Sequence, residues 1–308
     1  MILTICPNPS MDCTIELDSL NVGMLNRIEN KTITYSGKAQ NVALAIARLK
    51  GKAFSTGFMF ENEGKMFERA LDREGISHKF VWNKGSVRVN YKIIDKKSML
   101  TEINDKGALV EREKQLELID LVKELSADVD IAVMSGSLPK GVDNSFYQEV
   151  LSVIPSTVKK IVDTEKQNLD YALQSEVFMV KPNLRELESY VNKSLKTRKE
   201  VLTASYKLLD KGAKFVLVSL GADGAILTNG TKSYYSKSAN VAVNSKVGAG
   251  DSMVAAFAVN LEKTDDLEEL LRCSVSAGTA AVTTRGTNLF TKDKYDEIYK
   301  QITVQELK

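Results

Sequence analysis

Short runs of β-branched and other apolar residues alternate with amphipathic stretches along most of this 308-residue chain. The runs that read most clearly as strands cover residues 129–135, 160–163, 177–180 and 214–219. Helical periodicity is found over residues 41–50, 63–74, 113–126, 144–153, 185–191, 198–211, 251–261, 267–283 and 293–301. Strands that alternate with helices in this way are typical of βαβ units. The pattern predicts an α/β fold with a doubly wound, mostly parallel sheet flanked by helices.

Two regions depart from that alternation. Residues 13–20 with 27–35, and residues 87–95 with 98–104, alternate with a period near two and have turn signals between them in place of helices. We therefore expect a small separate β-sheet, formed by about 13–35 and 87–105. It would lie as a lid over the edge of the main sheet where open α/β folds bind ligands. No long linker or internal repeat divides the chain, which predicts a single domain over residues 1–308.

The charge balance and the apolar runs exclude several classes of function. The chain carries 42 Lys and Arg against 40 Asp and Glu, a net charge of +2, and no basic block interleaved with aromatic residues. A nucleic-acid partner is therefore not expected. No run of about 18 apolar residues occurs, and the chain begins with a strand-like segment in place of a cleavable leader. We expect no membrane contact and a cytoplasmic protein.

The cysteines and the histidine do not suggest a reactive or metal-binding site. Cys6, Cys13 and Cys273 are odd in number and lack CxxC spacing, so buried thiols are expected in place of disulfides or a zinc site. The single histidine, His78, has no obvious partner for a Ser-His-Asp triad or a histidine-based metal site. We expect it in a surface loop.

The sharpest chemical feature is the segment 247–252, which reads Val-Gly-Ala-Gly-Asp-Ser and precedes an apolar helix. Glycines at a helix N-terminus let backbone N–H groups converge on an anion, and the helix dipole adds to that attraction. A carboxylate at the same place, Asp251, is well placed to accept the proton of an attacking hydroxyl during phosphoryl transfer. The alternative is that Asp251 only caps an ordinary helix.

A second turn, residues 35–41, also precedes a helix and offers small residues, a cation and an amide. It is not a P-loop, because Ala39 stands where Ser or Thr should hold magnesium and Thr32 stands where the first glycine should be. No GxGxxG fingerprint occurs either, which disfavours a dinucleotide-binding enzyme. Polar or glycine-rich residues follow further strands, at 8–12, 135–141, 181–186 and 219–224, where a ligand crevice is expected.

Taken in order, these segments resemble the pfkB, or ribokinase-like, family of carbohydrate kinases, and within it the branch of 1-phosphofructokinases and tagatose-6-phosphate kinases. The segment 8–12 is similar to the family's start, 36–41 to its GGKGxN turn, 183–186 to its NxxE motif and 248–251 to its second signature. The resemblance covers essentially the whole chain. It implies a ribokinase-like fold, ATP and Mg²⁺ as cofactors, and phosphoryl transfer to a terminal hydroxyl of a ketohexose monophosphate.

The resemblance also implies roles for individual residues. Asp251 would be the catalytic base, with Gly248, Ala249 and Gly250 forming the anion hole. The sugar phosphate would be bound by Asp12, Arg27, Gly37, Lys38, Asn41, Arg88 and Ser137. The nucleotide would be bound by Asn183, Ser219, Gly221, Gly224 and Gly278, with Glu186 in the network around Mg²⁺ and phosphate. In this family the lid often pairs with that of another subunit, so a homodimer through the lid is expected, and exposed ribbon edges give a physical reason.

The phosphosugar branch is favoured over kinases of neutral sugars mainly by Arg88, because a guanidinium binds phosphate through paired donors. The segments 26–27 and 135–139 point the same way.

Three residues depart from the family pattern, namely Ser36, Ala39 and Lys246, and they leave the preferred sugar open. Two alternatives remain beside the phosphosugar kinase: a kinase of an unphosphorylated sugar or nucleoside on the same fold, and a non-catalytic nucleotide-binding regulator.

Overall fold

A large mixed sheet forms the centre of the molecule, in a computed structural model that describes residues 1–97, 99–284 and 289–307. Its parallel part has the spatial order β5 (Ser77–His78), β4 (Ala53–Asn62), β1 (Ile2–Cys6), β9 (Ile131–Ser135), β10 (Lys159–Asp163), β11 (Met179–Val180) and β12 (Phe215–Ser219). β6 (Val81–Ser86) pairs in parallel with the far end of β4. Strands such as β1 and β9 are buried along their whole length, which is why they read as apolar runs. The predicted doubly wound, mostly parallel sheet is confirmed.

An antiparallel extension completes the sheet beyond β12. It consists of β13 (Ala225–Thr228), β14 (Ser233–Ser236) and β15 (Val304–Glu306). The sequence did not predict these strands, nor β4, β5 and β6. The three antiparallel strands have only four, four and three residues, which is too short for a periodic pattern to emerge.

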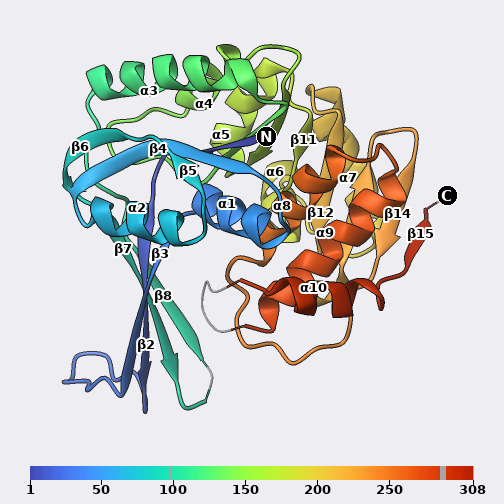
Figure 1. The fold of residues 1–308 in the computed structure, drawn as a ribbon. Helices are drawn as coiled ribbons and strands as arrows, with labels where there is room; N and C mark the ends of the chain where they lie inside the picture. The colour runs from blue at the N-terminus through green and yellow to red at the C-terminus, as the bar shows by residue number, and fades with distance from the viewer. Residues whose placement is uncertain (98, 285–288, 308) are drawn as a thin grey trace.

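Helices cover both faces of the sheet, as predicted. They are α1 (Lys38–Arg48), α2 (Gly64–Arg73), α3 (Arg112–Leu125), α4 (Phe146–Ser152), α5 (Lys166–Ala172), α6 (Leu184–Val191), α7 (Arg198–Asp210), α8 (Ala249–Leu261), α9 (Leu267–Val282) and α10 (Lys292–Tyr299). Figure 1 shows α3, α4 and α5 on one side of the sheet and α1, α8 and α9 on the other. α5 was not predicted.

Two helices begin earlier than predicted, at Lys38 for α1 in place of residue 41 and at Ala249 for α8 in place of residue 251. A glycine with positive φ stands before each one, Gly37 at 140° and Gly248 at 78°. A Cβ on Gly37 would lie 2.2 Å from Oε1 of Gln40, so the chain turns there as only glycine allows. As a result, residues 38–41 and 249–251 lie in first helical turns.

A separate small sheet forms the predicted lid. Its strand order is β3 (Asn30–Ser36), β2 (Ser10–Leu17), β7 (Arg88–Asp95) and β8 (Leu100–Asn104), with β2 and β7 parallel and the outer pairs antiparallel. Figure 1 shows these strands extending away from the main body. The lid begins at Ser10 and not at residue 13. Asp12 therefore lies within a lid strand.

The expectation of buried thiols is confirmed, since Cys6, Cys13 and Cys273 are buried and unbridged. The expectation that His78 lies in a surface loop is wrong. His78 ends β5, stacks on Phe80 and places Nε2 3.1 Å from Oδ1 of Asp72, because the short edge strand packs it against α2. In the part of the chain that the structure describes, no helix has both the length and the apolar composition needed to cross a membrane.

Candidate active site

The carboxyl ends of the parallel strands bring together residues that are far apart in the sequence. β1, β9, β10, β11 and β12 run in the same direction, so the segments that leave them lie along one edge of the sheet. Asp163 is the last residue of β10, and Lys181 directly follows β11. The first turns of α1 and α8, which pack together, contribute Lys38, Asn41 and Asp251. We call these five residues the Asp251 cluster.

Asp251 is the third residue of α8 and is only 6% exposed. Its Oδ2 accepts a hydrogen bond of 2.8 Å from Nδ2 of Asn41. Gly248 occupies the cap position of α8, and among the described residues the Asp251 side chain bonds to Asn41 and makes no capping bond. The alternative in which Asp251 only caps the helix is therefore wrong. The backbone N–H groups of residues 249–251 lie in the first turn, where a helix offers no carbonyl to accept them.

Two lysines flank a buried aspartate beside Asp251. Nζ of Lys38 lies 3.3 Å from Oδ1 of Asp163, and Nζ of Lys181 lies 3.4 Å from Oδ2 of the same residue. Asp163 and Lys181 are both buried. Sequence reasoning missed these two residues. A signal was available, because Asp163 ends a predicted strand and Lys181 stands two residues before the NxxE segment.

The charges in the cluster shift the titration of its members. Burial raises the pKa of Asp251 to about 6, repulsion from Asp163 adds to that rise, and the attraction of Lys38 opposes it. Burial also works against the charge of Asp163, but Lys181 and Lys38 outweigh it and hold the pKa of Asp163 below its usual range. Burial lowers the pKa of Lys38, but the neighbouring carboxylates, above all Asp163, outweigh burial and raise that pKa. At neutral pH, Asp251 is thus a carboxylate whose pKa suits a general base.

On the lid, Asp12 is held by two side chains of β7. Lys92 forms a buried ion pair with Oδ2 of Asp12, and Nδ2 of Asn90 donates to Oδ1 at 3.2 Å. Asn90 stands opposite Asp12 in the pairing of β2 with β7. Sequence reasoning missed Lys92 and Asn90. The alternation that places positions 88, 90 and 92 on one face of a strand could have found them.

Arg88 lies where the lid joins the main body. Its Nη2 donates to the carbonyl of Asn8 at 3.1 Å, its Nε to that of Pro9 at 3.4 Å and its Nη1 to that of Asp105 at 3.1 Å. Asn8 and Pro9 lead into the lid, and Asp105 leaves it. The guanidinium therefore bridges both connections. Each Nη also carries a second N–H, which is chemically able to bind a ligand.

Ser137 follows β9 and lies between the lid connection and the Asp251 cluster. Nδ2 of Asn8 donates to Oγ of Ser137 at 3.3 Å and to the carbonyl of Lys106 at 3.1 Å. On the other side, a Cβ on Gly136 would lie 3.9 Å from Cβ of Lys38. Asn8 was not among the predicted site residues, although it belongs to the motif that contains Asp12.

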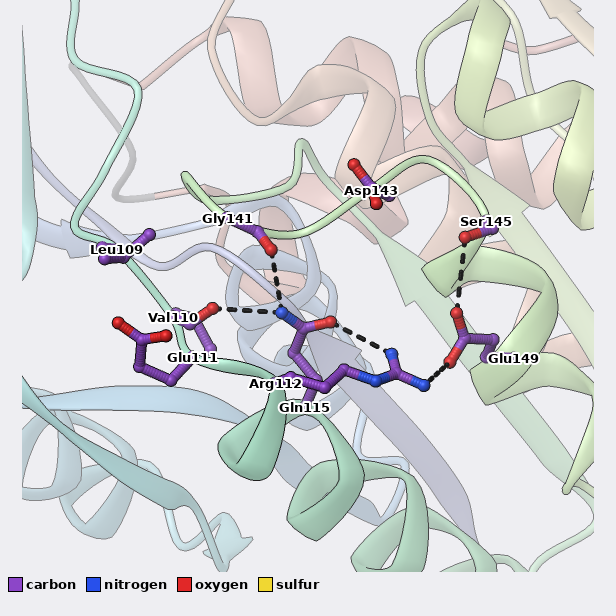
Figure 2. A pocket seen from close by; sticks show the side chains of 9 residues that line it. All are labelled: Leu109, Val110, Glu111, Arg112, Gln115, Gly141, Asp143, Ser145 and Glu149. Carbon is purple, nitrogen blue, oxygen red and sulfur yellow. Dashed lines mark hydrogen bonds and ion pairs between the residues drawn. The ribbon is translucent and has the colours of Figure 1, made fainter.

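The segment 136–141 follows β9 and carries Ser137. Gln115 of α3 fixes the far end of this segment, at Gly141, beside a surface cavity of about 420 Å³. Figure 2 shows Nε2 of Gln115 donating to the carbonyls of Val110 and Gly141, at 3.0 and 2.9 Å, while Arg112 links Gln115 to Glu149. None of the predicted site residues lines this cavity. The network therefore contributes by holding the segment that carries Ser137.

Asn183 and Glu186 form a capping box at the start of α6. Oδ1 of Asn183 accepts the backbone N–H of Glu186 at 2.9 Å, and Oε2 of Glu186 accepts that of Asn183 at 2.8 Å. Ser219, the last residue of β12, pairs with Asn183 through a parallel bridge. The structure thus brings these three predicted residues together.

Three glycines predicted near the nucleotide have different surroundings. Gly221 has open space around its α-carbon, whereas a Cβ on Gly224 would lie 1.8 Å from the carbonyl oxygen of Ser236. Gly224 therefore allows a close approach of two backbones. A Cβ on Gly278 would lie 2.7 Å from Cγ of Met253. Gly278 lets α9 pack closely on the first turns of α8.

Arg27 lies in the exposed loop between β2 and β3, and the structure does not bring it to the Asp251 cluster; within the described residues its side chain makes no hydrogen bond or ion pair. The three residues that depart from the family pattern, Ser36, Ala39 and Lys246, lie in different surroundings. Ser36 ends β3 and donates from Oγ to Oδ1 of Asn41 at 3.2 Å. Ala39 is buried in α1, and Lys246 is exposed before α8.

The residues present fit a magnesium ion that arrives with a nucleotide better than a protein-built metal centre. Among residues 1–97, 99–284 and 289–307, no group of three or more His, Cys, Asp or Glu side chains could hold a metal ion. Mg²⁺ commonly uses only one or two carboxylates together with substrate phosphates and waters. Glu186 offers such a carboxylate. Its capping bond uses Oε2 and not Oε1, and its negative charge helps to raise the pKa of Lys38 in the Asp251 cluster.

Comparison with known proteins finds a matching family and similar proteins. Residues 8–294 match the sequence profile of a family described as pfkB family carbohydrate kinase. The tagatose-6-phosphate kinase of Staphylococcus epidermidis is 32% identical over 311 aligned positions, which cover 100% of both chains. The 1-phosphofructokinase of Vibrio cholerae is 27% identical, with 99% of this chain and 97% of the relative covered. A crystal structure of phosphofructokinase-2 from Escherichia coli matches with a TM-score of 0.90 at 30% identity, covering 97% of this chain and 98% of that one.

Proposed function

The chain belongs to the pfkB family of carbohydrate kinases, and we propose that it transfers the γ-phosphoryl group of ATP to a free terminal hydroxyl of a ketohexose monophosphate. One observation carries the proposal most directly. A buried carboxylate with a pKa of about 6, Asp251, lies in the first turn of a helix, with Lys181 in the same cluster. A base, a helix N-terminus and a cation are groups that suit phosphoryl transfer from ATP.

In this mechanism Asp251 accepts the proton of the attacking sugar hydroxyl. The backbone N–H groups at Gly248, Ala249 and Gly250 bind the transferring phosphoryl group, whose negative charge the helix N-terminus favours. Lys181 adds a positive charge beside Gly250. Because these donors are fixed before the reaction, they stabilise the transition state without costly rearrangement.

The sugar phosphate is bound between the lid and the main body. Its hydroxyls contact Asp12 and Asn41, next to Gly37. Its phosphate is bound by Arg88, Lys38 and Arg27, with Ser137 as a further donor. Arg27 is remote from the cluster within this subunit, so a role for it requires closure of the lid or a second subunit.

The nucleotide is bound along the carboxyl ends of β11 and β12. Asn183, Ser219, Gly221 and Gly224 line this edge, and Gly278 keeps α9 close to α8. Glu186 would act on Mg²⁺ indirectly, through the network of phosphates around the ion, and Mg²⁺ would neutralise charge on the β- and γ-phosphates. Because the reaction consumes ATP, we also propose that the enzyme acts in the cytoplasm.

Two ketohexose monophosphates share the arrangement that the proposed reaction requires. Fructose 1-phosphate and tagatose 6-phosphate, as furanoses, each place a phosphate on one exocyclic carbon and a free hydroxyl on the other. A site with Arg88 at one end and Asp251 at the other could accept this arrangement in either sugar, so we expect turnover of both. Fructose 6-phosphate has the same arrangement, and the relatives named tagatose-6-phosphate kinase and 1-phosphofructokinase are our ground for placing the other two sugars ahead of it. An ADP-release assay with these three sugars tests the expectation, with ribose and adenosine as controls.

One observation bears on the rival function, a kinase of an unphosphorylated sugar or nucleoside. Arg88 already donates to backbone carbonyls, and this would give it a structural role without any phosphate. Turnover confined to ribose or adenosine would establish the rival. Tight ATP binding in calorimetry, without turnover of any of the five compounds, would instead identify a non-catalytic regulator.

We further propose a homodimer formed through the lid. Asp12 and Asn90 lie on one face of the lid, and the neighbouring positions place Ile33 and Tyr91 on the other, 46% and 40% exposed. Ile103, opposite Tyr91, is 57% exposed. An exposed apolar sheet face of this kind is typical of an interface, and a second copy with the same face would cover it.

Sedimentation equilibrium tests the dimer. Ile103→Asp should produce monomers, whereas Tyr171→Asp, an exposed aromatic on α5, should leave the dimer intact. A monomeric wild-type protein at micromolar concentration would contradict the proposal.

A further inference from the structure

Ser36, Asn41 and Asp251 form a chain of two buried hydrogen bonds. Oγ of Ser36 lies 3.2 Å from Oδ1 of Asn41, and Nδ2 of Asn41 lies 2.8 Å from Oδ2 of Asp251. The three side chains are 2%, 3% and 6% exposed. Ser36 stands where the sequence pattern of the sugar-binding turn has a glycine, so this chain carries a hydroxyl that the pattern lacks.

The direction of both bonds follows from the groups involved. A carboxylate accepts hydrogen bonds, so the amide nitrogen of Asn41 must face Asp251. The amide oxygen then faces Ser36, and the serine hydroxyl donates to it. If the amide turned over, its oxygen would face the carboxylate, and the serine proton would lose its acceptor in a buried place. Ser36 therefore favours the amide orientation that donates to the charged form of Asp251.

We infer that Ser36 is a positioning residue, whose hydroxyl holds the Asn41 amide in the orientation that donates to the catalytic base Asp251. The inference rests on the proposed function and deepens it. Ser36 is also the last residue of β3, where it pairs with Ser10 of β2. Two hydrogen bonds thus connect the lid sheet to the base on α8, so the end of β3 supports the amide that donates to the catalytic carboxylate.

The other charged groups that act on Asp251 are independent of this chain of bonds. They are Asp163 at the end of β10, Lys38 in α1 and Lys181 after β11. Ser36 makes its hydrogen bond to Asn41 and none to these three residues. Loss of the serine hydroxyl therefore leaves those charges in place. The hydrogen bond that favours the charged carboxylate is weakened, so Asp251 should become easier to protonate.

Ser36→Ala and Ser36→Gly test the inference, compared with wild type in steady-state kinetics from pH 5 to pH 9. We expect kcat to fall about two- to tenfold, the usual effect of one lost hydrogen bond, with the KM for ATP nearly unchanged. We also expect the acid limb of kcat/KM, near pH 6 in wild type, to move to higher pH. Ser36→Thr keeps the hydroxyl and should restore the wild-type profile.

A matched control is Ser55→Ala. Ser55 is a fully buried serine of β4 whose Oγ has no hydrogen-bond partner among the described residues. Deleting that hydroxyl should leave kcat and the acid limb unchanged. In an Asn41→Ala background, Ser36→Ala should have no further effect on the acid limb, because the bond chain is already broken.

A measurement without substrate separates this inference from the proposed function. Titration of ¹³C-labelled aspartate carboxyls by NMR, with Asp251→Asn used for assignment, reports the pKa of Asp251 directly. A higher pKa in Ser36→Ala than in wild type supports the inference, even if no sugar phosphate is turned over. An unchanged Asp251 titration in both Ser36→Ala and Ser36→Gly would overturn it, as would an equal shift in the Asn41→Ala background.

Discussion

The ammonium nitrogen of Lys181 lies 3.1 Å from the position that a Cβ would occupy on Gly250. The first turn of α8 thus receives positive potential from two sources, the helix N-terminus and a buried lysine. Asp163 keeps that lysine in place at 3.4 Å. A side chain at position 250 would crowd the ammonium group, so the glycine favours the close approach of Lys181.

Lys181→Met should therefore lower kcat about 10²–10³-fold, the usual effect of removing one fixed charge from a transition-state site. The KM for the sugar phosphate should change little, because Lys181 lies at the α8 end of the site. Lys160→Met is the matched control: Lys160 is also buried, but its Nζ donates to the carbonyl of Ser175. If the turnover of Lys181→Met stays within threefold of wild type, Lys181 has only a structural role.

Asp251→Asn should lose about 10²–10⁴-fold in kcat, the usual share of general-base catalysis, while it still folds and binds ATP. The asparagine can keep an oxygen toward Asn41, so the loss reports the missing base and not a broken contact. Calorimetry measures ATP binding, and the coupled assay measures turnover at saturating substrates. A variant that keeps most of its turnover would show that another group accepts the proton.

The same substitution should stabilise the protein above pH 6. The pKa of Asp251 is raised from 3.8 to about 6 by burial, so the folded state binds more protons than the unfolded state between these values. The free energy of unfolding of the wild type thus falls as pH rises through that window, and the loss is complete above pH 6. Asparagine does not titrate, so Asp251→Asn should gain about 1–3 kcal/mol at pH 8.

Thermal unfolding at pH 8 and at pH 4 measures this effect. The gain should appear as a Tm increase of a few degrees at pH 8 and should vanish near pH 4, where the wild-type carboxyl is neutral as well. A Tm difference that does not depend on pH would contradict the raised pKa.

The sequence predicted the architecture well because the helices and buried strands carry long periodic patterns. Both lid ribbons were predicted for the same reason. β13, β14 and β15 were missed because three or four residues cannot show a period. The starts of α1 and α8 were misplaced, because Gly37 and Gly248 looked like parts of longer turns, whereas each is the last residue before its helix.

The site was predicted where a local motif carries it and missed where tertiary contacts build it. Asp251 and Asn41 stand in recognisable segments, and the structure joins them by a hydrogen bond. The importance of Asp163 and Lys92 depends on partners that are distant in the sequence. Asp163 pairs with Lys38, 125 positions away, and Lys92 pairs with Asp12, 80 positions away. The end of a predicted strand and the alternation along a strand could have marked both residues as candidates, but a single sequence gives no measure of these pairings. Arg88 was predicted, but its contacts with backbone carbonyls could not be, since they depend on how the lid joins the body.

Those contacts leave Arg88 at the lid connection, where we propose that it binds the phosphate of the sugar. A charge-assisted bidentate contact to phosphate contributes about 1.5–3 kcal/mol, so Arg88→Ala should raise the KM for the sugar phosphate roughly tenfold or more. The KM for ATP should remain nearly unchanged, because Arg88 lies at the lid connection and not beside β12. Arg73→Ala, an exposed arginine of α2, is the control and should change neither constant.

Arg88 also joins the chain that enters the lid at Asn8 to the chain that leaves it at Asp105. Arg88→Lys keeps the charge but has a single nitrogen, which cannot reach both carbonyls and a phosphate. We therefore expect Arg88→Lys to keep part of the sugar-phosphate affinity while it loosens the lid, seen as faster amide exchange in β2 and β7. If both variants weaken ATP and sugar phosphate equally, Arg88 serves the lid connection only, and the sugar's phosphate is bound by other residues.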